Sequence, residues 1–238
     1  MRLTSASAVI LSLFCSAFSQ STAQEQPYFS SQAVYIYLGK TAPSPDLKNT
    51  VSLRVLDENA ENFPSLVVVI TPQQQLTSKI DFGLNAQVLW NPDSSGFAVT
   101  GSSEGANGRY HTSAFLLRDG RLVQVPLTRM IENAFGHPVK CGWPESPNVA
   151  AVKWLDNRRL LLAAEVINHS NCDCFGTFKG YVVDVFTQSV GRAYDQLGVK
   201  GKFRADLGSW LKDANDDWAR NPKSCYVAAN HPELHNSR

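Results

Sequence analysis

The feature that most constrains the fold of this chain is a regular alternation of short apolar runs with turn signals. The runs are rich in Val, Ile, Leu and Phe, and Pro, Gly and small polar residues separate them. Such spacing predicts an all-β protein built from antiparallel strands. Twelve runs are predicted as strands: Ala33–Leu38, Thr50–Leu56, Ser65–Thr71, Leu76–Ile80, Gln87–Trp90, Gly96–Thr100, His111–Leu117, Arg121–Val125, Ala150–Trp154, Arg159–Ile167, Phe178–Phe186 and Ser189–Ala193.

The runs group into repeats. Trp90 and Trp154 each stand before a polar turn that contains an Asp, and an apolar strand follows each turn. Each unit continues with a polar loop and a hairpin, and Asp119-Gly120 between two apolar runs is a strong hairpin signal. Ser65–Ile80 resembles the hairpin half of the same unit. We therefore predict three four-stranded antiparallel meanders.

The segment from Trp90 through Asn-Pro-Asp-Ser-Ser-Gly to Gly101 resembles the blade repeat of TolB-like and WD40-like β-propellers. In those blades a Trp-x-Pro-Asp-Gly turn precedes an apolar strand, whereas Ser94 replaces the glycine here and the copy at Trp154 lacks the proline. The resemblance covers residues 87–125 and, more loosely, 150–193. It implies propeller-like sheets and no particular function. Closed propellers typically have four or more blades, so three blades imply an open arc, a barrel-like closure or a regrouping of strands. A β-sandwich is the alternative.

Two helices are expected beside the sheets. Thr128–Phe135 is short and ends at Gly136. A longer helix near 204–220 is indicated by apolar residues at helical spacing, and we expect its tryptophans to pack on a sheet. Two segments are expected to be loosely held, Gln24–Gln32 and the tail Ala228–Arg238.

The N-terminus has the pattern of an export signal. Arg2 precedes an apolar core from Ala6 to Phe18, and Ser21-Thr22-Ala23 supplies small residues for cleavage. We therefore expect residues 1–23 to be a signal peptide and residues 24–238 to be one β-rich domain that is periplasmic or secreted. No later stretch approaches 18 consecutive apolar residues, so no transmembrane segment is expected.

Four cysteines remain after the predicted cleavage, and an even number in an exported chain suggests disulfides. A bond between Cys172 and Cys174 would close a very small ring, so each is expected to pair with Cys141 or Cys225, in an order that stays open. A metal site built on these residues and His169 is the alternative, but their spacing differs from that of zinc knuckles and ribbons.

Charge and motifs exclude several functions. The chain has 22 Lys and Arg against 21 Asp and Glu, which gives no electrostatic reason to expect a nucleic acid partner. The glycine-rich segment Gly101–Gly108 has no following helix or lysine for a phosphate. His231 and His235 flank Pro232 close to the C-terminus, where a frayed tail is expected. We expect neither a cofactor nor a metal.

Three side chains are candidates for binding: Tyr110, His111 and Trp143. They belong to the polar segments Gly101–Tyr110 and Gly136–Asn148, or border them; Asn168–Phe178 is the third such segment. Packing of Trp143 near a disulfide is the alternative. Glu165 lies within an apolar run, where a carboxylate is either solvated at a sheet edge or buried with a raised pKa.

No nucleophile, metal or cofactor motif is present, so the sequence favours an exported, non-catalytic binding module that uses its loops. Its partner would be a protein or another envelope or extracellular ligand. An exported hydrolase with a site assembled from separate loops is one alternative, and a structural component of the envelope is another.

Overall fold

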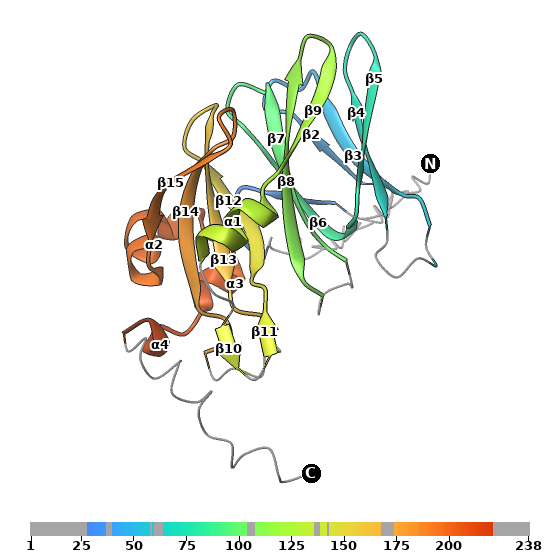
Figure 1. The fold of residues 1–238 in the computed structure, drawn as a ribbon. Coiled ribbons are helices and arrows are strands. Elements are labelled where there is room, and N and C mark those ends of the chain that lie inside the picture. The colour runs from blue at the N-terminus through green and yellow to red at the C-terminus, as the bar shows by residue number, and fades with distance from the viewer. Residues whose placement is uncertain are drawn as a thin grey trace, which may run out of the picture.

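Three antiparallel β-sheets stack face to face in the computed structural model of this chain (Figure 1). The structure describes residues 28–36, 40–57, 59, 64–103, 108–135, 139–141, 143–167 and 174–220, and the side chains of 84, 85, 139–141, 143–145 and 218 are outside that description. The first sheet contains β2 (Thr41–Pro43), β3 (Thr50–Val55), β4 (Ser65–Ile70) and β5 (Gln75–Ile80). The second contains β1 (Val34–Ile36), β6 (Leu84–Trp90), β7 (Gly96–Ser102), β8 (Tyr110–Arg118) and β9 (Arg121–Pro126). The third contains β12 (Asn148–Trp154), β13 (Arg159–Glu165), β14 (Phe178–Asp184) and β15 (Ser189–Tyr194).

The predicted all-β class and the meander topology are confirmed. Each of the twelve predicted runs overlaps a strand, and neighbouring strands within each sheet pair. The predicted hairpin at Asp119-Gly120 is present: both residues have positive φ, and Arg118 pairs with Arg121 across a two-residue turn. Three stacked sheets differ from the two of a β-sandwich, so that alternative does not describe the fold.

The first meander differs from the prediction in its first strand. The run Ala33–Leu38 contains β1, which pairs with β6 and becomes the fifth strand of the second sheet. The place at the start of the first sheet belongs to β2, which has three residues and ends in Pro43. A short strand with a proline carries almost no sequence signal, and it is tolerated here because β2 is an edge strand.

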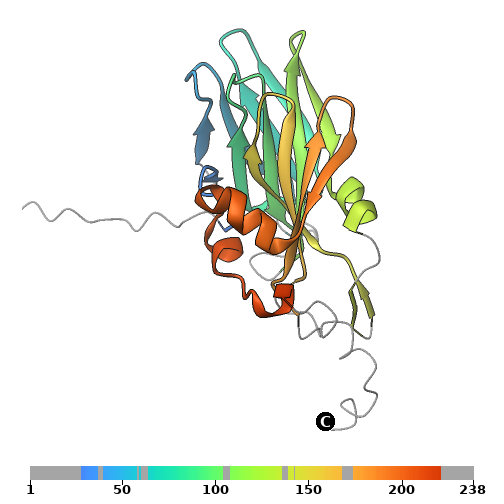
Figure 2. The same cartoon turned by 90° about the vertical axis from the view of Figure 1, so that its left-hand side faces the viewer.

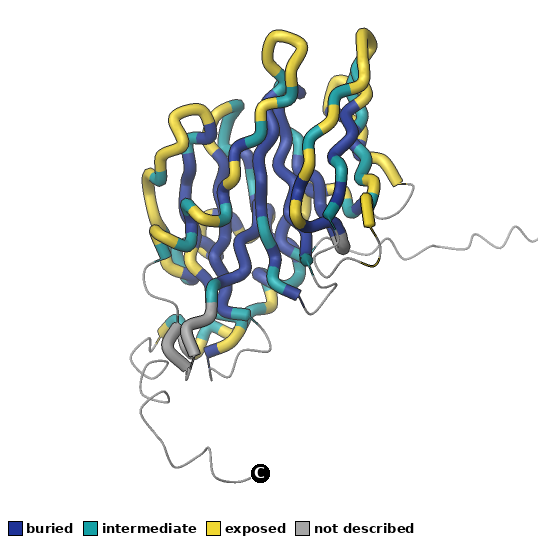
Figure 3. The backbone as a smooth tube through the Cα atoms, turned by 45° about the vertical axis from the view of Figure 1, so that its right-hand side comes forward, coloured by how far each residue is buried: buried dark blue, intermediate teal, exposed yellow. Residues whose placement is uncertain are grey.

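Apolar side chains fill the spaces between the layers. One cluster lies between the first and second sheets and includes Val67, Phe97 and Phe115. Another lies between the second and third sheets and includes Leu116 and Leu162. The central strands are therefore buried along most of their length, while the hairpin tips are exposed (Figure 3).

Helices cover the outer face of the third sheet (Figure 2). The expected helical cap is confirmed, but it begins earlier and is divided into α2 (Gln196–Phe203), a 3-10 turn (Arg204–Asp206), α3 (Ser209–Asp213) and α4 (Asp217–Arg220). Phe203, Leu207 and Leu211 pack on this sheet as their spacing predicted. Phe29 is fully buried in the same layer and Ser30 bridges to Leu207, so Tyr28–Gln32 is held by the domain rather than loose. Residues 24–27 and 228–238 lie outside the described residues.

The remaining elements follow the strands of the second sheet in the sequence and precede those of the third. α1 (Thr128–Phe135) has the predicted bounds. β10 (Val139–Cys141) and β11 (Trp143–Glu145) form a separate two-stranded sheet, where the sequence predicted a loop. No helix in the described part of the chain is long and apolar enough to cross a membrane.

The two repeat tryptophans have equivalent roles. Trp90 ends β6 and donates its indole N–H to the carbonyl of Ala42 in the first sheet, at 3.2 Å. Trp154 ends β12 and donates to the carbonyl of Leu89 in the second sheet, at 2.9 Å. Trp90 thus ties β6 to β2 of the preceding sheet, and Trp154 ties β12 to β6 of the preceding sheet.

The turns after these strands also repeat, including one that the sequence reading missed. Asp46, Asp93 and Asp156 each accept a hydrogen bond from the backbone N–H two residues later. Leu47 and Ser94, which follow the first two aspartates, both have positive φ. Ser44-Pro-Asp46 is therefore the first-sheet counterpart of Asn91-Pro-Asp93, and the left-handed backbone explains why glycine suits the position of Ser94.

Two buried threonines join the second and third sheets. β12 is the edge strand of its sheet and lies across β6, β7 and β8. The Thr112 hydroxyl donates to the carbonyl of Val149 at 2.7 Å, and the Thr100 hydroxyl accepts from the N–H of Ala151 at 3.0 Å. The two hydroxyls also bond each other at 2.9 Å. The buried edge of β12 therefore has hydrogen-bond partners without a neighbouring strand.

We expect Thr112→Val to destabilise the protein by about 1–3 kcal/mol, because the carbonyl of Val149 would lose its partner inside the core. Urea unfolding followed by circular dichroism measures the change. Thr77→Val is the matched control, since Thr77 is exposed on β5, and it should alter the free energy of unfolding by no more than about 0.5 kcal/mol. Equal effects of the two substitutions would contradict a special role for Thr112.

Candidate functional site

The two ends of the sheets differ in kind. At one end, which we call the hairpin rim, six short turns join the strands: 44–49, 71–74, 91–95, 119–120, 155–158 and 185–188. At the opposite end, the loop rim, longer connections leave the sheets (Figure 1). All three polar segments that the sequence singled out leave from the loop rim.

The anchor points of those three segments contact one another. Tyr110 begins β8, Asn148 begins β12, and Asn148 pairs across the sheet with Glu165, which pairs in turn with Phe178. The side-chain oxygen of Asn148 accepts the backbone N–H of Tyr110 at 3.0 Å. The ends of segments 103–109, 142–147 and 166–177 are thereby fixed around one buried point.

Glu165 is buried, which is one of the two environments that the sequence left open. Its side chain is 2 % exposed. The Asn148 amide donates to its carboxylate at 3.1 Å. Burial raises the pKa of Glu165 to about 7, and the bond from Asn148 offsets only part of that effect. A carboxyl with this pKa can be protonated or ionised near neutral pH.

Tyr110 is in the core and not on a binding surface, contrary to its selection as a binding residue. It is fully buried, with Phe29 at 4.9 Å and Trp210 at 5.6 Å between ring centroids in edge-on geometry. Burial, with Tyr28 and Tyr35 nearby, raises the pKa of its hydroxyl. That hydroxyl has no hydrogen bond in the described part of the chain. A side chain with no exposed surface cannot contact a partner directly.

His111 is half-buried and lies in a groove of about 490 Å³ at the loop rim. The groove is bordered by the ends of β5 and β9, the start of β8, and α1. Its lining combines charged, amide, hydroxyl and apolar groups: Lys79, Ile80, Asp81, Phe82, Arg109, His111, Thr112, Ser113, Gln124, Pro126, Thr128, Arg129, Glu132 and Asn133. We call it the His111 groove.

The imidazole of His111 is held in position without a hydrogen bond among the described residues. It stacks on Phe82, with ring centroids 5.9 Å apart and planes 20° apart. Burial lowers the pKa of His111 to about 4, and the positive charge of Arg109 adds to this, against a smaller opposite effect of Asp81. The ring is therefore neutral at pH 7, with one N–H donor and one acceptor.

The wall of the groove beside His111 is an ion pair. Arg109 at the start of β8 pairs with Glu132 on α1, and both side chains are about one quarter to one third exposed. The Arg109 guanidinium also donates to the carbonyl of Pro147 at 3.4 Å. This pair fixes α1 to the start of β8 and to the chain that enters β12.

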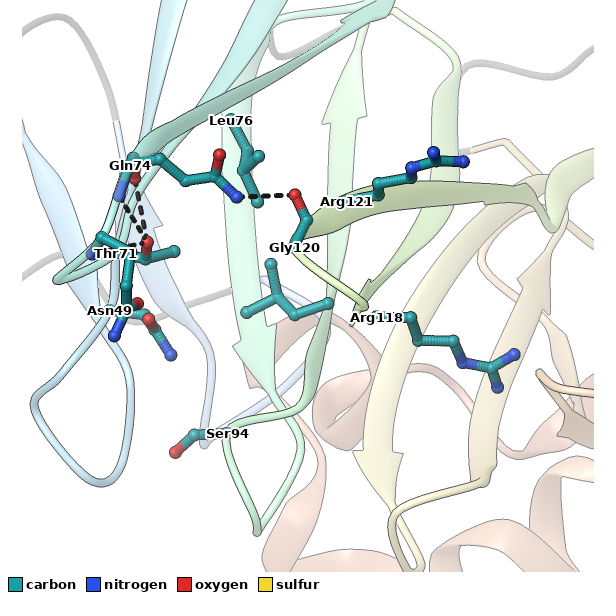
Figure 4. A pocket seen from close by; sticks show the side chains of 10 residues that line it. Asn49, Thr71, Gln74, Leu76, Ser94, Arg118, Gly120 and Arg121 are labelled. Atoms are coloured by element: carbon teal, nitrogen blue, oxygen red, sulfur yellow. Dashed lines mark hydrogen bonds between the residues drawn. The ribbon is translucent and has the colours of Figure 1, made fainter.

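A second cavity, of about 410 Å³, lies at the hairpin rim (Figure 4). Gln74 donates to the carbonyl of Gly120 at 2.6 Å and so ties the tips of two hairpins together. Arg118 and Arg121 point away from Gln74, and the Arg118 guanidinium stacks 3.9 Å from the ring of Phe186 in the third sheet. These contacts join neighbouring sheets, which is a structural role.

The structure describes less of the other residues that the sequence singled out. Trp143 lies in β11, and its side chain is outside the described residues. Cys174 is fully buried. Cys172, Cys225 and the side chain of Cys141 lie outside the description, so the two disulfides stay a prediction. The described residues contain no group of three or more His, Cys, Asp or Glu side chains that could hold a metal.

Sequence reasoning did not find Arg109, Glu132, Asn148 or Phe82. Each is an ordinary residue in its local sequence, and each gains its role from a contact over more than 10 residues in the chain. A polar residue just before a predicted strand, as Asn148 is before Ala150, was the only signal available.

Comparisons with known proteins give a fold resemblance only. No family model matches the sequence, and no curated protein is similar to it. Among solved structures, the chain is similar to the β-propeller domain of the Trilobed protease from Pyrococcus furiosus, which has an open velcro topology. The TM-score is 0.37 at 14% sequence identity, over 69% of this chain and 43% of that one. The chain thus spans less than half the length of that chain.

We expect Tyr110→Ala to destabilise the protein by about 3–5 kcal/mol, as is usual when a buried aromatic ring is removed. Tyr110→Phe should be close to neutral, because the hydroxyl loses no hydrogen bond within the described residues. Urea unfolding of both variants checks this pair of expectations. A stable Tyr110→Ala protein would show that the ring is not needed in the core.

Glu165 should make stability depend on pH in a defined window. Its folded pKa of about 7 exceeds the ordinary value of 4.5, so its contribution is fully present below pH 4.5 and is lost as pH rises to about 7. The expected loss is on the order of 3 kcal/mol. Carboxylates whose pKa is lowered, such as Asp46 and Asp184, act below this window.

Glu165→Gln should remove this dependence, because the amide does not titrate and can still bond Asn148. The measurement is the difference in free energy of unfolding between the native protein and Glu165→Gln at pH 4.5, 6 and 7.5. A difference that stays constant across these values would contradict the buried, protonated carboxyl.

Proposed function

We propose that this protein is an exported, non-catalytic binding module that captures a protein or other extracellular ligand at its loop rim. The observation that carries the proposal is the convergence of the three polar segments on the buried contacts of Tyr110, Asn148 and Glu165. The His111 groove opens at the same rim. Export itself is inferred from the apolar N-terminal core and the small residues up to Ala23.

Rigidity of the anchors supports binding through these segments. A loop whose ends are fixed loses less conformational entropy when it meets a partner. Here the backbone at the anchors is tied by sheet pairing, by the bond from Tyr110 to Asn148, and by the ion pair of Arg109 with Glu132. Disulfides that use Cys141, Cys172, Cys174 and Cys225 would restrain the same segments further.

Of the two candidates whose side chains the structure describes, Tyr110 and His111, only His111 has exposed surface for a partner. Unlike Tyr110 it is partly exposed, and unlike the groups beneath it, it has no hydrogen bond within the described chain. A neutral, stacked imidazole with a free donor and a free acceptor is suited to hydrogen bonding with a ligand.

The test is capture by the immobilised protein from the periplasmic or extracellular fraction of its source. We expect His111→Ala to lower capture about tenfold, the effect of one good hydrogen bond in a partly desolvated site. Arg121→Ala at the hairpin rim is the control and should leave capture unchanged. Unfolding by urea should be similar for all three proteins, so that a loss of capture is not a loss of folding.

Capture that is unchanged by His111→Ala but falls with Arg121→Ala would place binding at the hairpin rim and overturn the proposal. The same outcome follows if no component of the fraction is retained above the level seen with a denatured sample.

An exported hydrolase is the second candidate, and one observation favours it. Glu165 is buried beside Asn148 with a pKa near neutrality, which suits a general acid or base. Turnover in a broad hydrolase screen that disappears with Glu165→Gln or His111→Ala would establish this function instead. A structural role in the envelope remains a third candidate, with no contact in the described residues that favours it.

A further inference from the structure

The polar groups on the floor of the His111 groove are already paired. Gln124 accepts the hydroxyl of Ser78 at 3.0 Å and donates to Ser113 at 3.2 Å. The Thr128 hydroxyl accepts the N–H of Thr112 at 2.8 Å. The floor is therefore a closed set of hydrogen bonds that offers little to a ligand.

Three groups at the mouth of the groove could bind an anion and lack a partner among the described residues. Lys79 at the end of β5, Arg129 on α1 and His111 have no ion pair or hydrogen bond among the described residues, although all three line the same cavity. Arg109 is neutralised by Glu132. Asp81 is the opposing charge at the mouth, so the titratable groups there without an ion pair among the described residues are two cations, one carboxylate and one neutral imidazole.

We propose that the His111 groove binds an oxyanion of its ligand, a carboxylate or a phosphoryl group, between Lys79 and Arg129, with His111 donating a hydrogen bond. The proposal rests on the proposed function and names the chemistry of the ligand at that site. Two exposed cations on different elements that face one cavity attract an anion more strongly than either does alone. The buried ring of Phe82 lines the same cavity, and an apolar wall of this kind strengthens the attraction.

The state of His111 agrees with a cationic environment. Arg109 contributes to the low pKa of its imidazole, and Asp81 counters only part of the combined effect. An anion bound beside the ring would favour the imidazolium and raise the pKa of His111. By reciprocity the anion would bind more tightly as pH falls toward that pKa. Lys79, Arg129, Arg109, Asp81 and Glu132 are the charged groups that face the ring's cavity.

The experiment is a titration of the purified protein with inorganic phosphate and, separately, with acetate, at constant ionic strength set by chloride. The readout is the imidazole resonance of His111 in proton–carbon NMR spectra, assigned with His111→Ala. We expect a saturable shift and a higher pKa of His111 in the presence of the bound anion. Response to acetate alone identifies a carboxylate site, and response to phosphate alone identifies a phosphoryl site.

Matched variants separate a site from general attraction. Lys79→Gln and Arg129→Gln should each weaken binding about fivefold, which corresponds to about 1 kcal/mol. Lys48→Gln and Arg121→Gln remove the same charges at the hairpin rim and should leave binding within about a factor of two. An unshifted His111 resonance with both anions overturns the proposal. So does equal weakening by Lys48→Gln and Lys79→Gln.

The outcomes also distinguish this proposal from the proposed function. If capture depends on His111 but neither anion shifts its resonance, the oxyanion proposal is wrong and the proposed binding function stands. If an anion shifts the His111 resonance but capture is unchanged by His111→Ala, the oxyanion site stands and the groove does not take part in partner capture.

Discussion

The stacking of these sheets depends on how the edge of β12 satisfies its backbone. An edge strand buried against another sheet would leave carbonyl and amide groups without partners. Thr100 and Thr112 supply those partners from the face of the second sheet. The indole N–H of Trp154 does the same for the carbonyl of Leu89. Because hydroxyl and indole groups replace a neighbouring strand, β12 can lie across the second sheet, and the loop anchors at Tyr110 and Asn148 come into contact.

The two ends of the stack explain how three sheets suffice. The outer face of the third sheet is apolar, and the helices and Phe29 cover it. The outer face of the first sheet is only partly polar: Ser52 and Thr77 flank Val68 directly across the ladder, while Ile70 on the same face is 53% exposed. Polar residues on an outer face are typical of terminal repeats. The stack of three sheets is open, with helices over one outer face and polar side chains beside apolar ones on the other.

The sequence predicted most of the fold and little of the site, for one physical reason. Strands such as β8 and β13 carry their signal locally, in apolar residues bounded by turn residues, and even the bounds of α1 could be read. β2 could not, because its pairing depends on its neighbour β3 and Pro43 argues against a strand. Tyr110 and His111 are adjacent in sequence, yet opposite faces of β8 send one into the core and the other into a groove. Which face is buried depends on the third sheet, which no local pattern reveals.

The acids of the molecule are in different environments at the two rims. At the hairpin rim the Ser44 hydroxyl lowers the pKa of Asp46, and the backbone N–H of Thr187 lowers that of Asp184, so these charges are consumed in holding turns. At the loop rim burial raises the pKa of Glu165, whereas a hydrogen bond from Lys200 lowers the pKa of Asp216. Polar groups that stabilise a fold are paired, whereas a buried carboxyl near its pKa and an unbonded imidazole cost stability. Both costs fall at the rim where the three predicted polar segments are anchored, which supports the proposal that this rim binds a ligand.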